Sequence, residues 1–405
     1  MRLRTSINPA TAGLYFCTMG ASLSTLAFGF GSPTYFLSII LGLVLSVVAI
    51  MQHGGKIFII FSFIAYILLL QNIITSLNYT NDTGNQLIQH YMRYPAVLSV
   101  IAVAIAARLT DEHSFSRAAM FIAISHTVVL AITIGNPSQL DIQARISTEN
   151  AAVAALAEIA LGTAWAGMLS RKLSVAILAI IVSFAVIFLA QMRTTGIALA
   201  ISLIFFLWSY FSSRNGSYVK LMLIFSAVGI SGFSTFIFWE RIYGAFRSIL
   251  LLDDKNRGID SGFSGRFDNF ESGMANFLEN PILGIGFSDP VVNYTHNGYI
   301  LTAAQFGGPI AIILIFLLIS SARRSFINEK SAAFGVIMGL AFFYVGQPRN
   351  LNSQLCPLIG IICVSRLYGA RRASYQKPDL DKTSPALALR HKNMPEASPT
   401  YKMGY

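Results

Sequence analysis

Three basic side chains lie at the borders of apolar stretches, where they could bind an anion or accept a proton. Arg193 interrupts a run that is otherwise apolar from residue 174 to 211. Arg266 opens a predicted amphipathic helix, where a guanidinium and the first amides of the helix together favour an anion. His296 closes a long polar segment, and a neutral imidazole there can take a proton from a hydroxyl group. The set predicts a site that neutralises negative charge beside a general base.

Each of these three residues also has a structural explanation that the sequence leaves open. Arg193 could be an interfacial anchor whose charged end reaches the lipid headgroups. Arg266 could be a solvated loop charge, and a lone histidine such as His296 is usually a satisfied interfacial residue. A functional role is favoured because Arg193 lies in a very short turn, and because His296 is the only histidine of its long polar loop.

Other positions carry weaker indications of chemistry. Glu158 lies about two turns inside an apolar run, where a carboxylate is costly, so it is either functional or a neutral hydrogen-bond donor between helices. Arg349 lies in another short turn and is more typical of a structural residue. Both remain weak candidates for substrate binding. Asp253 and Asp254 could bind a divalent cation, but adjacent carboxylates in a polar loop are usually only solvated. The sequence therefore predicts no metal site. Without a metal ion, the negative charge of a diphosphate group would have to be neutralised by arginines.

The composition indicates that these residues belong to a membrane protein. The chain has 405 residues, of which 54% are hydrophobic and 12% charged, and its mean hydropathy is +0.61. This apolar content exceeds what a water-soluble core of this size needs. The net charge of +11 does not indicate nucleic-acid binding, because Lys and Arg occur in short patches between apolar runs. The three cysteines lack the spacing of a metal site or a disulfide framework.

About twelve apolar runs are candidates for crossing a bilayer, which takes about 20 residues per helix. They fall near residues 10–28, 33–50, 57–75, 95–107, 118–135, 151–168, 173–190, 195–212, 219–238, 297–320, 331–346 and 353–368. The predicted architecture is an all-α, polytopic membrane protein. It has nine transmembrane helices in residues 1–238, a large loop in 239–295, three more helices in 296–370 and a disordered tail in 371–405.

The distribution of positive charge predicts the orientation of these helices. Cytoplasmic loops of membrane proteins are enriched in Lys and Arg. If both termini are cytoplasmic, nine of the 29 Lys and Arg residues lie outside and the other twenty lie inside. The large loop is then periplasmic, together with Arg193, Arg266, His296 and Arg349.

The large loop is predicted to contain one amphipathic helix that lies on the outer membrane surface. Its apolar residues recur at helical spacing, and they are Phe267, Phe270, Met274, Phe277 and Leu278. Asn280 and Pro281 end this helix. The glycines that follow, in Leu283–Gly286, predict a sharp bend and not a nucleotide-binding loop, because no βα unit surrounds them.

The order of several motifs resembles the O-antigen ligase family, which also includes O-antigen and exopolysaccharide polymerases. The motifs are Ser264-Gly-Arg266, Asn280-Pro-Ile-Leu-Gly-Ile-Gly286, and His296-Asn297 followed by Gly307. The short turn at Arg193 and the plan of about twelve helices with one large outer loop add to the resemblance. Family members often carry an acidic residue two positions before this glycine, where the chain has Gln305.

The resemblance implies an inverting membrane glycosyltransferase of the GT-C-like class in the bacterial inner membrane, with no cofactor and no metal. Its donor would be an undecaprenyl-diphosphate-linked glycan. Its acceptor would be a hydroxyl group of lipid A-core, or of a second lipid-linked glycan. Arg193 and Arg266 would engage the diphosphate, His296 would act as the base or position the acceptor, and Asn297 would bind substrate.

Three further assignments stay open. A ligase is slightly favoured over a polymerase, because one arginine and histidine set without a second arginine-rich outer loop indicates a single carrier site. A transporter, such as a flippase of lipid-linked glycans, would place polar groups and broken helices near the bilayer midplane. This chain concentrates its charged groups at one face, which favours the enzyme. A structural scaffold is the least favoured alternative, because it would not need the arginines and histidine of the outer face.

Overall fold

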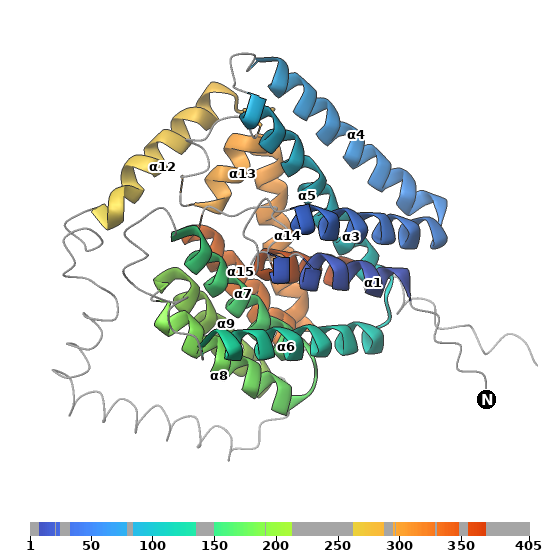
Figure 1. The fold of residues 1–405 in the computed structure, drawn as a ribbon, viewed down its shortest axis with the longest axis vertical. Coiled ribbons are helices and arrows are strands. Elements are labelled where there is room, and N and C mark those ends of the chain that lie inside the picture. The colour runs from blue at the N-terminus through green and yellow to red at the C-terminus, as the bar shows by residue number, and fades with distance from the viewer. Residues whose placement is uncertain are drawn as a thin grey trace, which may run out of the picture. The chain divides into compact units, whose positions relative to one another are not determined.

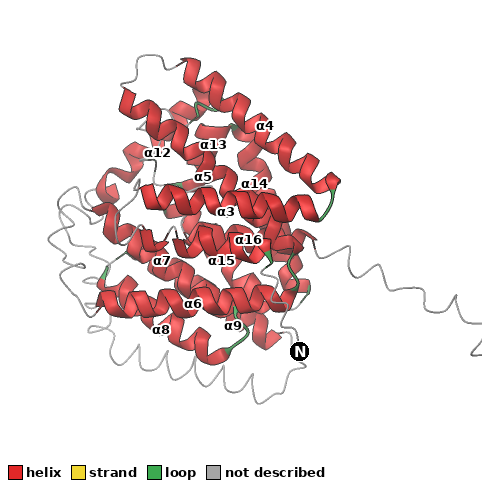
Figure 2. Cartoon of the chain, turned by 45° about the vertical axis from the view of Figure 1, so that its right-hand side comes forward, coloured by secondary structure: helices red, strands yellow, loops and turns green. Residues whose placement is uncertain are grey.

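The computed structural model describes most of the chain as a set of helices. The described residues are 8–20, 22–24, 33–78, 84–134, 150–190, 192–212, 262–286, 295, 297–328, 330–347 and 355–369. No strand occurs among them (Figure 2). The chain divides into two compact units, Met1–Leu367 and Tyr368–Tyr405. The predicted span at 219–238 and the predicted tail at 371–405 lie outside the described residues.

The helices follow one another through the first unit (Figure 1). In chain order they are α1 (Pro9–Tyr15), the π-helix η1 (Phe16–Gly20), α3 (Pro33–Gln52), α4 (Gly55–Asn78), α5 (Gly84–Leu109), α6 (Glu112–Ile134), α7 (Asn150–Leu169), α8 (Leu173–Leu189), α9 (Arg193–Ser212), α12 (Gly262–Glu279), α13 (Gly298–Phe306), α14 (Gly308–Ile327), α15 (Ser331–Gly346) and α16 (Leu355–Gly369).

Three of these helices are long and apolar enough to cross a membrane. They are Pro33–Gln52, Glu112–Thr133 and Gly308–Ile327. Seven shorter apolar helices accompany them, at Gly55–Gln71, Tyr94–Leu109, Ala155–Leu169, Leu173–Leu189, Arg193–Trp208, Ser331–Gly346 and Leu358–Leu367. The described part of the chain therefore has the predicted all-helical, membrane-type architecture, whereas the predicted count of about twelve spans is not confirmed.

Most predicted spans match observed helices, and the differences have local causes. The predicted span 297–320 is wrong as one helix, because Gly307 divides it into α13 and α14. The span predicted at 95–107 covers only the second half of α5. The helix begins at Gly84, and its first half contains several polar residues, so hydropathy did not predict it as part of the span. The first predicted span changes from an α-helix to a π-helix at Phe16.

Small residues let α9 and α15 pack closely in the core. Gly335 and Gly339 are four residues apart on α15, and both face Ser202 of α9. A Cβ atom at either glycine would overlap with Ser202, so the spacing fits the close approach that small residues allow between membrane helices. Trp165 of α7 is fully buried and donates from Nε1 to Ser202 Oγ at 2.8 Å. The three helices α7, α9 and α15 lie together in Figure 1.

Large apolar side chains remain exposed along several helices. On α8 they include Ile177, Ile181, Phe184 and Phe188, and on α14 they include Ile312, Phe316 and Ile319. A protein in water would bury such rows, whereas a lipid-facing surface is as apolar as the lipid tails themselves. The exposed rows therefore agree with a bilayer as the solvent.

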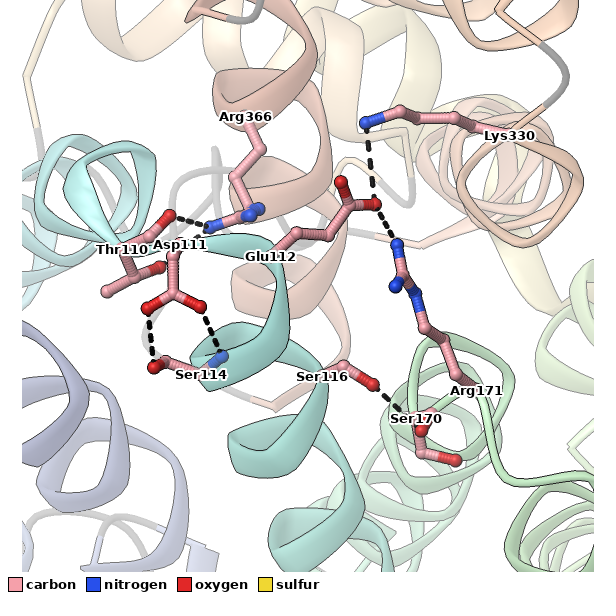
Figure 3. A network of polar contacts seen from close by, with 9 residues as sticks. All are labelled: Thr110, Asp111, Glu112, Ser114, Ser116, Ser170, Arg171, Lys330 and Arg366. Atoms are coloured by element: carbon pink, nitrogen blue, oxygen red, sulfur yellow. Dashed lines mark hydrogen bonds and ion pairs between the residues drawn. The ribbon is translucent and has the colours of Figure 1, made fainter.

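One end of the helices carries a charged network that ties together loops far apart in the sequence (Figure 3). Glu112, at the start of α6, contacts Arg171 at 2.5 Å and Lys330 at 3.6 Å. Ser116 donates to the carbonyl oxygen of Ser170 at 2.8 Å. The loops before α6, α8 and α15 therefore share one end, as expected for loops predicted to lie on the same side of the membrane.

Arg366 of α16 extends this network to the end of α5. Its Nη1 donates to the carbonyl oxygens of Ala107 at 2.5 Å and Thr110 at 3.0 Å, and to Thr110 Oγ1 at 2.7 Å. Its guanidinium lies 4.1 Å from the ring centroid of Phe115. A cation at the C-terminal end of a helix satisfies carbonyls that lack partners within the helix. Nearby, hydrogen bonds from the Ser114 hydroxyl and amide lower the pKa of the Asp111 carboxyl from its ordinary value.

Candidate functional site

The first predicted site residue, Arg193, opens helix α9. The link from α8 is short, and its backbone is held by bonds from the amide of Ala190 to the carbonyl of Val186 and from the amide of Met192 to the carbonyl of Ile187. The predicted tight hairpin is therefore present. Arg193 is half-buried at the end of this hairpin, and the next residues, Thr194 and Thr195, are buried.

A second helix start, that of α13, lies next to the predicted base. Asn297 is the N-cap of α13, and its Oδ1 accepts from the amides of Tyr299 at 3.0 Å and Ile300 at 3.1 Å. Its Nδ2 donates to the carbonyl of Val345 at 3.3 Å. These bonds give Asn297 a capping role, and its predicted role in substrate binding stays a prediction. His296 lies outside the described residues, one peptide bond from this cap.

The C-terminal end of α15 holds both helix starts together. Thr194 Oγ1 donates to the carbonyl of Gly346 at 3.5 Å, next to the Val345 carbonyl that Asn297 contacts. The hydroxyl of Tyr299 also donates to Ala341 of α15, at 2.8 Å. Because α15 ends between the two, Arg193 and the cap beside His296 are brought to the same end of the fold. Arg349 lies outside the described residues, two positions after the last described residue of this segment.

Measured along the axes of α7 and α9, Glu158 lies at about the same height as the first turn of α9. It is completely buried in α7. Two short hairpins join α7 to α8 and α8 to α9, so α7 and α9 run in the same direction. The bond between Trp165 and Ser202 aligns them, and Glu158 and Thr195 each lie seven residues earlier on their own helix. At about 1.5 Å per residue both lie about 10 Å from that bond, towards the end that carries Arg193.

Arg266 is carried by α12, the helix predicted from the apolar spacing in the large loop. Its backbone lies in the first half of α12, and the second half packs on the start of α13. A Cβ at Gly273 would lie 2.8 Å from Thr295 Oγ1, which shows how closely α12 passes the residue before His296. Arg266 is seven residues before Gly273, about 10 Å along the helix. The observed helix confirms the predicted one, while its position on the membrane surface remains a prediction.

The predicted bend after α12 pairs its backbone with the junction of α13 and α14. Gly284, Gly286 and Gly307 have positive φ angles of 71°, 74° and 87°. The bonds run from the amide of Gly284 to the carbonyl of Asn280 (2.9 Å), Ile285 to Ala304 (2.7 Å), Gly286 to Gln305 (3.1 Å) and Gly308 to Pro281 (2.8 Å). The motif glycines thus form the sharp bend that was predicted, and the bend supports the broken helix.

Replacing Gly307 with alanine is expected to destabilise this junction. Gly307 has a positive φ angle, and a Cβ there would overlap with the carbonyl of Ile282. The strained backbone alone should lower the free energy of unfolding by about 1 to 3 kcal/mol. Thermal unfolding of the purified protein in detergent should show a lower Tm. The matched control is Gly55→Ala, because a Cβ at Gly55 meets nothing within 4 Å. Equal Tm values for the two variants would contradict the expected strain.

One polar residue near the site was not recognised from the sequence. Gln71 of α4 donates from Nε2 to the carbonyls of Leu283 at 2.5 Å and Gln305 at 2.9 Å. The available signal was a glutamine inside a long apolar run, where an amide needs a partner. The acidic pair Asp253 and Asp254 lies outside the described residues.

Comparison with known proteins adds a family to this geometry. Residues 178–316 match the family model described as O-antigen ligase. The matched segment includes Arg193, Arg266 and Asn297, together with the helix break at Gly307. No curated protein and no solved structure matches the chain. The match over residues 178–316, about a third of the chain, supports an assignment of this segment to the O-antigen ligase family.

Proposed function

We propose that the chain transfers a glycan from an undecaprenyl-diphosphate carrier to a hydroxyl acceptor at the periplasmic face of the bacterial inner membrane. The observation that carries the proposal is the meeting of the starts of α9 and α13 at the end of α15. This meeting brings Arg193 to the helix cap beside His296, inside the matched O-antigen ligase segment. A diphosphate at headgroup level needs cationic partners at that depth, and a hydroxyl nucleophile needs a base beside them.

In the proposed reaction, the acceptor oxygen attacks the anomeric carbon of the donor sugar. The bond from that carbon to the carrier diphosphate breaks, and the diphosphate leaves with the electron pair. Arg193 and Arg266 stabilise the charge that develops on it, which makes a metal ion unnecessary. His296 takes the proton of the acceptor hydroxyl. Attack opposite the leaving group inverts the anomeric carbon. Glu158 and Arg349 are the weaker members of the proposed substrate-binding set.

A ligase acting on lipid A-core is the favoured form of this activity. A polymerase must hold two carrier lipids at once, whereas the sequence offers one arginine and histidine set on its outer side. The same donor chemistry would also serve an O-antigen or exopolysaccharide polymerase. The acceptor that receives the glycan distinguishes the two.

One structural observation favours a transporter of lipid-linked glycans as the second candidate. The break between α13 and α14 resembles the broken helices that line transport sites. In this chain, however, protein groups bind the carbonyls at the break, since Ile285, Gly286 and Gln71 donate to Ala304 and Gln305. Carbonyls already bound in this way are not offered to a cargo, so the enzyme is the better candidate.

The purified protein in liposomes with lipid-linked glycan tests these alternatives. We expect the mass of a lipid A-core acceptor to rise by that of the glycan, with release of the carrier diphosphate. Growth of the glycan on its carrier would indicate a polymerase. Movement of the lipid between leaflets without any change of glycan mass would overturn the enzyme and support the transporter.

The predicted topology has its own test. Single cysteines at positions 193, 266 and 296 are expected to react with a membrane-impermeant thiol reagent added from the periplasmic side. A cysteine at position 171, within the charged network at the other end, is the control and should react only after the inner face is opened. Labelling in the reverse pattern would contradict the proposed orientation.

A further inference from the structure

Breaking a helix inside an apolar environment leaves backbone groups that must find partners in the protein. The last carbonyls of α13 and the first amides of α14 are such groups. The bend at Asn280–Gly286 bonds to Ala304, Gln305 and Gly308. One side chain from a distant part of the sequence completes the set, and it belongs to Gln71 of α4.

The Gln71 carboxamide joins the two backbone segments of the junction. Its Nε2 donates to the Leu283 carbonyl in the bend and to the Gln305 carbonyl in the last turn of α13. An amide nitrogen carries two hydrogens, so both bonds can form together. The Gln305 carbonyl also accepts from the amide of Gly286, and its two lone pairs allow both contacts. Gln71 thus clamps the bend and α13 together.

Helix α4 makes few other attachments through its described side chains. Phe61 is the only buried one among them, and most of the apolar side chains of α4 are exposed. The hydroxyl of Tyr94 donates to the Ala65 carbonyl at 2.7 Å, which ties α4 to α5. The bonds of Gln71 lie six residues further along α4, at the junction of α13 and α14. A glutamine in a helix this exposed to lipid is costly unless its amide is used.

The consequence for the candidate site follows from the length of α13. This helix has nine residues, about 13 Å. Its start is fixed to α15 through Asn297 and Tyr299, and its end is fixed by the bend and by Gln71. Because both ends of this short helix are fixed, its orientation relative to α15 is fixed as well. Loosening the Gln71 end would tilt the helix and displace the cap that adjoins His296.

We propose that Gln71 is a positioning residue, which fixes the end of α13 and thereby the location of the Asn297 cap relative to the start of α9 at Arg193. The proposal rests on the proposed function, because it concerns the reaction that His296 and Arg193 would carry out. Gln71 itself does not contact the reacting groups.

Two variants at position 71 test this role. Gln71→Glu keeps the shape but removes the amide hydrogens and faces two carbonyl oxygens. It should lower kcat by roughly 10- to 100-fold, because small misplacements of a catalytic group have effects of this size. The KM for the lipid-linked donor should change little. Gln71→Lys can donate to both carbonyls, so it should recover much of the loss. Ser62→Leu, at an exposed site of the same helix, is the matched control and should keep normal kcat.

A second readout does not depend on activity. A cysteine at position 295, a buried position next to the cap of α13, should react with a soluble thiol reagent severalfold faster when Gln71 is also replaced by glutamate, because the cap is no longer held. Unchanged kcat and unchanged thiol reactivity in Gln71→Glu would overturn the positioning role, as would a loss of kcat explained fully by a lower Tm. If the unaltered protein transfers no glycan, the proposed function fails, and the thiol rates alone decide whether Gln71 holds this segment.

Discussion

Replacing Arg193 with alanine is expected to lower the rate of glycan transfer by about 30-fold to 1,000-fold, the effect of removing about 2 to 4 kcal/mol of transition-state stabilisation. Arg193 opens α9 next to the end of α15, where we propose that its guanidinium meets the carrier diphosphate. The loss should fall mainly on kcat, because the leaving diphosphate gains charge as its bond to the sugar breaks. Transfer from a lipid-linked glycan, measured with purified protein, gives both constants.

Two companion variants sharpen this result. Arg193→Lys should recover little, because lysine lacks the planar fork that engages two phosphate oxygens. Arg108→Ala removes an exposed arginine at the end of α5, the end that carries the charged network, and should leave transfer unchanged. The amount of each variant in the membrane serves as the folding control. Full activity of Arg193→Ala would exclude Arg193 from the site.

The helices themselves followed from the sequence because each is a run of apolar residues. The span predicted at 331–346 coincides with α15, and that at 173–190 coincides with α8 to within one residue. Hydropathy alone could not detect the break at Gly307, because the residues on both sides of it are apolar. The break depends on the positive φ angle of Gly307 and on the bend that donates to the exposed carbonyls. The hydrogen bonds from the bend are contacts between segments that are separated in the sequence, and a local hydropathy pattern does not contain them.

The site residues show the same division between local and distant information. Arg193 was predicted as a site residue because it is a charge at the edge of an apolar run, and that role stays a prediction. Asn297 was predicted as a substrate ligand, whereas its visible contacts are those of a helix cap, which a short polar residue before an apolar run also predicts. Gln71 could not be connected to the motif glycines, since its partners lie 212 and 234 residues away. The sequence identified chemical groups, and only the fold showed which of them are neighbours.

Replacing His296 with alanine is expected to lower transfer by about a hundredfold to ten-thousandfold, the usual contribution of a positioned general base. The wild-type rate should fall at acidic pH, because a protonated imidazole cannot accept the acceptor's proton. The residual activity of His296→Ala should lack this dependence. His113→Ala, at the exposed start of α6, is the control and should keep both the rate and the pH profile. A His296→Ala enzyme with the wild-type pH profile would assign the proton transfer to another group and leave His296, at most, a role in holding the acceptor beside the cap of α13.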